Sequence, residues 1–156
     1  MRIMDEIFFS FTFGGETLSL AAANAVLKKI NEEPVLEHIR DQGEKVAAGI
    51  NTLIKKHNVE KLFSVSGHNS WTFMHISDTE NFSEWEVKTF FIQEVLKRGV
   101  LTVGTHNMSY SHTDEDVARL LDVYDEVFFL TRNAIFKGNL LDLLCCKPIE
   151  PLFKLR

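Results

Sequence analysis

Cysteine is scarce in this chain of 156 residues, which contains only the adjacent pair Cys145 and Cys146. An adjacent pair cannot build a disulfide framework, and it lacks the CxxC spacing of zinc and redox sites. We therefore expect both thiols to be reduced, and no metal site is predicted from them.

Long apolar runs are also missing from the sequence. No stretch approaches the roughly 20 apolar residues that a membrane-spanning helix needs. A short apolar run lies near the start, but Asp5 and Glu6 interrupt what would have to be a signal peptide. The sequence therefore predicts a cytoplasmic protein with no membrane partner.

A basic stripe is the third absence. The formal net charge is −5, and the 22 acidic and 17 basic residues are spread through the chain. A nucleic-acid partner is therefore not expected. With 45% hydrophobic and 25% charged residues, the chain has the composition of one globular domain rather than of a disordered segment or a coiled coil.

Two helices are predicted in the first third of the chain. Apolar and small residues recur at helical spacing after Gly15: Leu18, Ala21, Ala22, Ala25, Val26 and Ile30. Pro34 should stop this helix near Asn31. A second, amphipathic pattern follows, with its buried face formed by Val35, Ile39, Val46, Ile50 and Leu53.

The middle of the chain changes to a strand pattern. Residues 62–66 and 70–76 are rich in β-branched and aromatic residues, and 66–69 between them resemble a turn, so a hairpin is predicted. Ser83 and Glu86 form a capping-box pair that opens a helix ending before Gly99. The buried face of that helix is expected to be Val87, Phe90, Phe91, Val95 and Leu96.

The last third begins with a predicted short strand at 100–103 and a polar loop at 106–112. Thr113 is the expected cap of a long helix that Gly138 ends. Its apolar positions are Val117, Leu120, Leu121, Tyr124, Val127, Phe128 and Ile135. Together these elements predict an α+β fold, in which a small antiparallel or mixed sheet is covered by helices.

One segment has the residues of an anion site. Ser10 to Glu16 reads SFTFGGE, an extended hydroxyl-bearing stretch that ends in two glycines before a helix. Glycines let the backbone turn and expose N–H groups, and the Thr12 hydroxyl and a helix N-terminus could complete a phosphate site. A plain Gly-Gly turn explains the same pattern, and Glu16 argues against an anion at the helix end itself.

Four segments resemble, in order, the class III (fold type I) pyridoxal-phosphate enzymes. They are FFSFTFGGETLSLAAANAVLKKI, SGHNSWTFMHI, VLKRGVLTVGTHNMSYSHTDEDV and CKPIEPLFKLR. The resemblance covers almost the whole chain. It is strongest to aminotransferases and aminomutases of the glutamate-1-semialdehyde 2,1-aminomutase type, and it places the chain in the carboxy-terminal portion of such an enzyme.

The resemblance implies a division of the chain and a role for two residues. Residues 1–33 would be a remnant of the large cofactor-binding domain, and 34–156 the carboxy-terminal small domain. Thr12 would bind the phosphate of pyridoxal 5'-phosphate, commonly in the partner subunit of a homodimer, assisted by the Phe13 N–H. In the family, the lysine that holds the cofactor precedes this motif, so Lys28 and Lys29 cannot replace it.

The resemblance therefore implies amino-group transfer on a small-molecule amine or amino acid in the complete protein. No catalytic residue is predicted here, and the isolated chain should be inactive and bind no cofactor. The stretch 104–113 lacks the Arg that many family members use to hold the substrate carboxylate. A stand-alone, non-catalytic binding or interaction domain that keeps the small-domain fold remains the alternative.

The histidines and aromatic residues are given structural interpretations. His68, His75, His106 and His112 have no helical metal-binding spacing. His106 and His112 flank a loop that could approach an active site, although a hydrogen-bonded loop before the Thr113 cap explains them as well. Trp71, Phe73, Trp85 and the phenylalanines are predicted to belong to the core.

Overall fold

The computed structural model describes residues 12–151, and within them the chain forms two compact units, divided between Leu36 and Glu37. The elements are, in order, α1 (Thr17–Glu32), α2 (Val35–Lys56), β1 (Phe63–His68), β2 (Trp71–Ile76), α3 (Glu84–Lys97), β3 (Thr105–Asn107), α4 (Asp114–Lys137) and the 3-10 helix η2 (Leu141–Leu143). This confirms the predicted α+β class.

The first unit contains α1, and no residue of this helix is buried. Glu16 caps its N-terminus, and Lys28–Glu32 and Lys29–Glu33 pair along its surface at 3.9 and 2.9 Å. The predicted start and end of the helix are confirmed to within a residue. Its apolar stripe, however, packs against nothing within its own unit, because Leu18, Val26 and Leu27 are 76%, 57% and 60% exposed.

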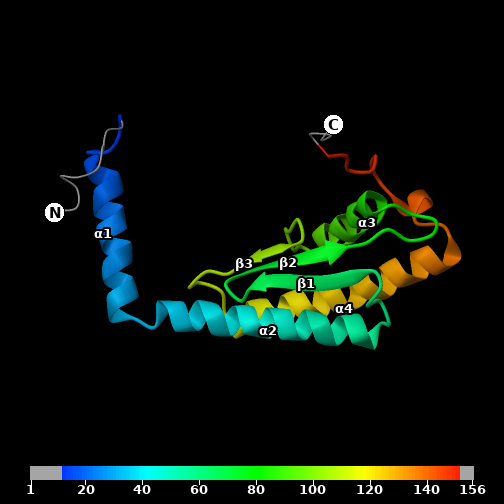
Figure 1. Cartoon of the computed structure of the whole chain (residues 1–156), viewed down its shortest axis with the longest axis horizontal. Helices are drawn as coiled ribbons and strands as arrows, with labels where there is room; N and C mark the ends of the chain where they lie inside the picture. The colour runs from blue at the N-terminus through cyan, green and yellow to red at the C-terminus, as the bar shows by residue number, and fades with distance from the viewer. Residues whose placement is uncertain (1–11, 152–156) are drawn as a thin grey trace. The chain divides into compact units, whose positions relative to one another are not determined.

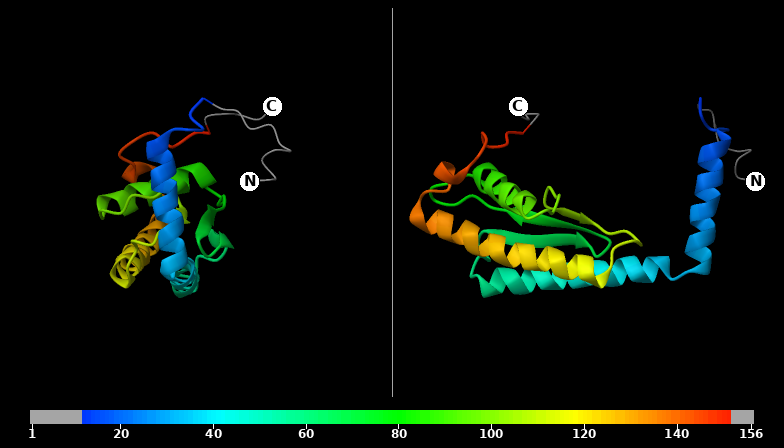
Figure 2. Two further views of the ribbon diagram at one scale, coloured as in Figure 1. Left: turned by 90° about the vertical axis from the view of Figure 1, so that its left-hand side faces the viewer. Right: turned by 180° about the vertical axis from the view of Figure 1, so that it is seen from behind.

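The second unit is a three-stranded antiparallel sheet in the order β1-β2-β3. Figure 2 (left) shows α2, α3 and α4 on the same side of this sheet. Strand residues that point toward the helices, such as Phe63, Thr72 and Met74, are buried, whereas their neighbours Ser64 and His75 are exposed. The sheet is thus covered on one face, which is the period-2 alternation of an antiparallel sheet.

An aromatic cluster joins the sheet to the helices. The ring of Phe63 from β1 lies 5.6 Å from Phe91 of α3 and 4.7 Å from Phe128 of α4, and Tyr124 packs edge-on against Phe91 at 5.2 Å. Aromatic pairs at these separations stabilise a core beyond the apolar area they bury. The strand and both helices are therefore held by one shared core.

Caps define the ends of the helices as the sequence predicts. Ser83 and Glu86 form a full capping box at α3, and Thr113 with Asp116 forms another at α4. Gly138 ends α4 with a left-handed φ of 68°, a conformation that glycine adopts without strain. The predicted buried face of α3 is confirmed except at Leu96, which is 54% exposed.

The predicted hairpin is present, but its turn is shifted. β1 continues through Gly67 and His68, which pair with Thr72 and Trp71, so the turn lies at 69–70 rather than at 66–69. Gly67 has a φ of 104°, and a glycine can stay in the ladder at that angle. The turn-like composition of this stretch therefore marks an irregular strand.

The strand predicted at 100–103 is wrong, and the loop predicted at 106–112 is shortened. Thr102 Oγ1 accepts the Gly104 N–H at 3.1 Å and donates to the Thr105 carbonyl at 3.3 Å, which turns the chain here. Pairing with β2 begins where the Gly104 carbonyl accepts the Met74 N–H at 2.8 Å. The strand that pairs with β2 is therefore β3 (Thr105–Asn107). Leu101 and Val103, in the stretch that was predicted to be a strand, are 87% and 61% exposed.

The expectation that the aromatic residues belong to the core is only partly correct. Most phenylalanines of the second unit are buried or half-buried, but Trp71, Phe129 and Phe136 are 52%, 51% and 91% exposed. Trp71 lies on the uncovered face of the sheet, with its ring 5.0 Å from that of Phe73. Aromatic identity alone does not indicate which face of a strand or helix is covered.

Candidate functional site

The turn before α1 carries the two residues that the sequence assigns to cofactor binding. Thr12 and Phe13 are both exposed in the turn 12–15, and the Phe13 carbonyl accepts the Glu16 N–H at 3.1 Å. An anion in solution can therefore reach the Thr12 hydroxyl and the backbone of this turn. The turn itself belongs to the first unit.

Glu16 occupies the end of the helix that follows. Its two carboxylate oxygens accept the N–H groups of Leu18 and Ser19 at 2.8 and 2.7 Å. Hydrogen bonds from Ser19 and Leu18 hold the pKa of Glu16 below its usual value, so its charge is retained. These helix donors are therefore not available to a phosphate, and anion binding at this turn would depend on Thr12 and the Phe13 amide.

A pocket of about 370 Å³ lies in the second unit, between α4, β3 and the loop that precedes β3. Thr102, Thr105 and Asn107 provide polar groups on one side, and Asp116 and Arg119 provide charges from α4 on the other. Apolar side chains line the rest of it: Val46, Val100, Leu101, Met108, Val117 and Leu120. The pocket is within the size range of small-molecule sites.

His106, which lines the pocket, belongs to a buried hydrogen-bond relay. His106 Nδ1 lies 3.0 Å from Thr72 Oγ1, and its Nε2 lies 2.9 Å from the Tyr124 hydroxyl. Burial lowers the pKa of His106 to about 4 and raises the pKa of Tyr124. Both groups are therefore neutral at neutral pH, and the relay connects β2, β3 and α4 without a charge.

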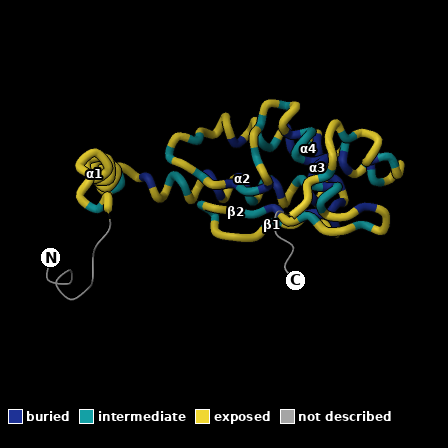
Figure 3. Tube along the Cα trace, turned by 90° about the horizontal axis from the view of Figure 1, so that it is seen from above, coloured by how far each residue is buried: buried dark blue, intermediate teal, exposed yellow. Residues whose placement is uncertain are grey.

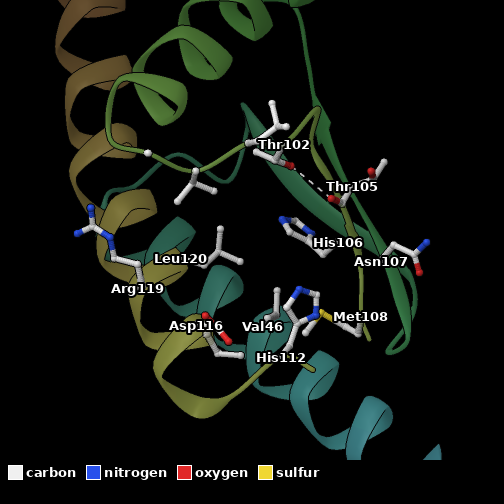
Figure 4. A pocket seen from close by; sticks show the side chains of 14 residues that line it. Val46, Thr102, Thr105, His106, Asn107, Met108, His112, Asp116, Arg119 and Leu120 are labelled. Carbon is white, nitrogen blue, oxygen red and sulfur yellow. Dashed lines mark hydrogen bonds between the residues drawn. The ribbon is translucent and has the colours of Figure 1, made fainter. Parts of the chain in front are cut away.

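His112 lies at the other end of the pocket with a defined tautomer (Figure 4). Its Nδ1 accepts the backbone N–H of Ser109 at 3.0 Å, so the neutral ring carries its proton on Nε2. Its backbone carbonyl accepts from His38 Nε2 at 2.8 Å. The predicted hydrogen-bonded loop before the Thr113 cap is thus confirmed.

The remaining predicted histidines lie apart from this pocket. His68 and His75 are exposed on the sheet, where their ring nitrogens meet the hydroxyls of Ser70 and Ser66 at 2.9 and 2.6 Å. Among residues 12–151, no group of three or more His, Cys, Asp or Glu side chains is placed to hold a metal ion. Within the same residues, no helix is long and apolar enough to cross a membrane.

The sequence interpretation missed the relay beside the pocket and two charged residues that line the pocket. Thr72, His106 and Tyr124 are far apart in the chain, so no local sequence pattern predicts the hydrogen bonds between them. Asp116 and Arg119 stand at i, i+3 on a predicted helix, which places them on one face, but only the fold shows that this face lines a cavity.

Comparison with known proteins gives an aminotransferase and an aminomutase among the relatives of the chain. No family model matches the chain. It is 30% identical over 122 residues to an acetylornithine aminotransferase of Caldanaerobacter subterraneus, which covers 74% of this chain and 29% of the relative. It is 26% identical over 143 residues to glutamate-1-semialdehyde 2,1-aminomutase 1 of Staphylococcus carnosus, a match that covers 81% of this chain and 33% of the relative.

The fold has a solved counterpart in the same group. The pyridoxal-phosphate internal aldimine form of the FumI protein of Sphingopyxis sp. MTA144 superimposes with a TM-score of 0.71 at 25% identity, over 85% of this chain and 31% of that one. This chain thus spans about a third of the length of the proteins it matches. In sequence and fold, the chain matches a carboxy-terminal portion of class III pyridoxal-phosphate-dependent aminotransferases and aminomutases.

Proposed function

We propose that this chain serves, together with an upstream large domain, in a homodimeric enzyme that transfers an amino group between small molecules. The single observation that supports this most strongly is the match of its fold and sequence to the last third of enzymes of this kind. In this proposal, residues 1–33 belong to the large domain and 34–156 form the small domain.

The cofactor contact in this proposal is Thr12. Its hydroxyl is exposed in a turn, as a phosphate ligand must be, and the Phe13 N–H lies beside it in the chain. Pyridoxal phosphate, when bound, supplies the electron sink for bond breaking at an amine-bearing carbon. Thr12 would donate a hydrogen bond to its phosphate, and the small domain would contribute a wall of the substrate site.

The isolated chain is proposed to be inactive. In the family the lysine that binds the cofactor covalently precedes the Gly14–Gly15 motif, and Lys28 and Lys29 follow it on the surface of α1. Incubation of the purified chain with pyridoxal phosphate and borohydride should therefore label several lysines weakly. A stoichiometric adduct at one lysine would contradict this part of the proposal.

The role of Thr12 can be tested in the polypeptide that contains the upstream domain. A charge-assisted hydrogen bond contributes about 1.5–3 kcal/mol, so Thr12→Ala should weaken cofactor binding about tenfold to a hundredfold. Thr12→Ser keeps the hydroxyl and should have a much smaller effect. Cofactor affinity is measured by the visible absorbance of the bound form.

Mixed dimers test whether Thr12 acts across the interface. Thr12→Ala subunits are combined with subunits that lack the cofactor lysine, so the one complete site receives its Thr12 from the partner. Affinity at that site should return to the value of the unaltered protein. If it stays as weak as in the Thr12→Ala homodimer, Thr12 serves its own subunit or only the turn.

A stand-alone binding or interaction domain is the second candidate. It is favoured by the second unit, which contains a core of its own made from its three helices and its sheet. A reading frame without an upstream cofactor-binding domain would support this candidate. A frame that contains such a domain with its lysine would support the enzyme.

A further inference from the structure

The two cysteines of the chain lie next to each other in the bend that follows η2. Cys145 and Cys146 are both free and both exposed. The Cα atoms of adjacent residues lie about 3.8 Å apart across a trans peptide bond, whereas disulfides usually join Cα atoms about 4.4–6.8 Å apart. The pair therefore cannot close on itself without strain, and the bend presents two thiols to solvent.

Helix α3 fixes the backbone that carries these thiols. Gln93 Oε1 accepts the Cys145 N–H at 2.6 Å, and Gln93 Nε2 donates to the Leu143 carbonyl at 3.0 Å. Further along, the Ile149 N–H donates to Thr89 Oγ1 at 2.8 Å. Figure 2 (left) shows this part of the chain, in orange and red, beside α3. The bend is thus tied to the helix on both sides of the cysteine pair, while the thiols stay accessible.

The number of sulfur ligands limits what the pair can hold. A structural zinc ion takes four ligands. Among residues 12–151, no group of three or more His, Cys, Asp or Glu side chains is placed to hold a metal ion. The bend therefore offers two thiols and no further ligand. It fits an acceptor that prefers sulfur and has two positions to exchange.

We propose that Cys145 and Cys146 form a dithiol site for trivalent arsenicals that carry one organic group and two hydroxyl groups. Each sulfur forms a bond to arsenic and displaces one hydroxyl group, which leaves as water with the proton of that thiol. Arsenic stays trivalent, so the reaction needs no oxidant or reductant. This inference does not rest on the function proposed above.

The adjacent position of the thiols is what makes the site tight. Once one sulfur is bonded, the second reacts within the same molecule at a high effective concentration. Gln93 adds to this, because a bend that is already fixed loses less conformational freedom on binding. We therefore assign Cys145 and Cys146 as the ligands and Gln93 as a positioning residue.

The test uses the reduced whole chain and phenylarsine oxide, and bound arsenic is counted by mass spectrometry of the intact protein. We expect one arsenical per chain, with the loss of both titratable thiols. Dithiothreitol, which supplies two thiols, should remove the arsenical at a concentration at which mercaptoethanol, with one, does not.

Variants separate the two thiols from their support. Cys145→Ser and Cys146→Ser each keep one thiol and should bind at least about a hundredfold more weakly. Gln93→Leu releases the bend and should weaken binding about twofold to tenfold. Lys88→Leu is the matched control, because Lys88 belongs to the same helix but packs on Trp85. It should leave the affinity unchanged.

The proposal is overturned if no arsenical is retained at equal concentrations of probe and chain. It is also overturned if either single-thiol variant binds as tightly as the unaltered chain. Unchanged affinity in Gln93→Leu, shown to be folded by circular dichroism, would contradict the role given to Gln93. Because the titration contains no pyridoxal phosphate, a negative result here leaves the Thr12 proposal standing.

Discussion

His106 shows how burial changes the chemistry of a single residue. The residue is 6% exposed, and both ring nitrogens are hydrogen-bonded to neutral hydroxyl groups, those of Thr72 and Tyr124. A protonated ring needs two acceptors and solvation, and this site supplies little solvation. The fold therefore selects the neutral form.

We expect His106 to make stability fall as the pH falls. Its pKa is lowered from 6.5 to about 4 by burial, so between these values the unfolded chain binds a proton that the folded chain does not. The contribution is lost progressively as the pH drops from about 7 to about 4, and amounts to about 3 kcal/mol.

Denaturant unfolding at both ends of that range measures the effect. Other groups titrate too, so the quantity to compare is the pH slope of the unaltered chain with that of His106→Gln, which should be shallower. If His106→Gln keeps the slope of the unaltered chain, folding does not lower the pKa of His106 and the explanation is wrong.

At the scale of elements, α2 and the hairpin meet at a glycine. A Cβ built on Gly43 of α2 would lie 1.6 Å from the carbonyl oxygen of Asn69 at the hairpin turn. Two atoms cannot share that space, so the turn approaches α2 this closely only because Gly43 has no side chain. This contact links two elements that are separate in the sequence.

Gly43→Ala should therefore destabilise the chain although alanine is the better helix former. Alanine gains about 1 kcal/mol in helix propensity, but overpacking against backbone costs about 1–3 kcal/mol or more, so a net loss in unfolding free energy is expected. Gly49→Ala is the comparison, because its Cβ would meet the side chain of Leu121 at 2.4 Å, and a side chain can move aside. A smaller loss at Gly43 than at Gly49 would contradict this explanation.

The sequence predicts the helices of this fold better than the strands. Caps are local signals, and Ser83, Thr113 and Gly138 each mark a helix end that the structure confirms. Strand limits depend on pairing with distant residues. The apolar stretch 100–103 has strand composition but no place in the ladder, because Thr102 turns the chain before Gly104 meets β2.

The candidate site likewise has one part that the sequence predicts and one part that only the fold reveals. The exposed turn at Thr12 could be found from its hydroxyl and glycines, and its proposed role comes from resemblance to a family. The pocket depends on β3, the loop before it and one face of α4 coming together. No spacing in the sequence encodes that meeting, so Arg119 was not predicted to line a site.

At the scale of the whole molecule, the two units differ in what stabilises them. The second unit has a core in which Val87, Tyr124, Val127 and Phe128 are fully buried. The first unit has α1, a helix of 16 residues with none buried. Isolated helices of this length are marginally stable in water, because most helix stability in proteins comes from packing.

Hydrogen exchange should therefore separate the two units in the isolated chain. The slowest amides of α4 report global unfolding, on the order of 5 kcal/mol or more, whereas α1 amides should exchange within about a hundredfold of the unstructured rate. Glu16→Ala removes the cap that accepts from Leu18 and Ser19 and should speed exchange in α1 while leaving α4 unchanged. If α1 exchanges as slowly as α4, another surface covers it, and exchange repeated at decreasing protein concentration shows whether that surface is a second copy of the chain.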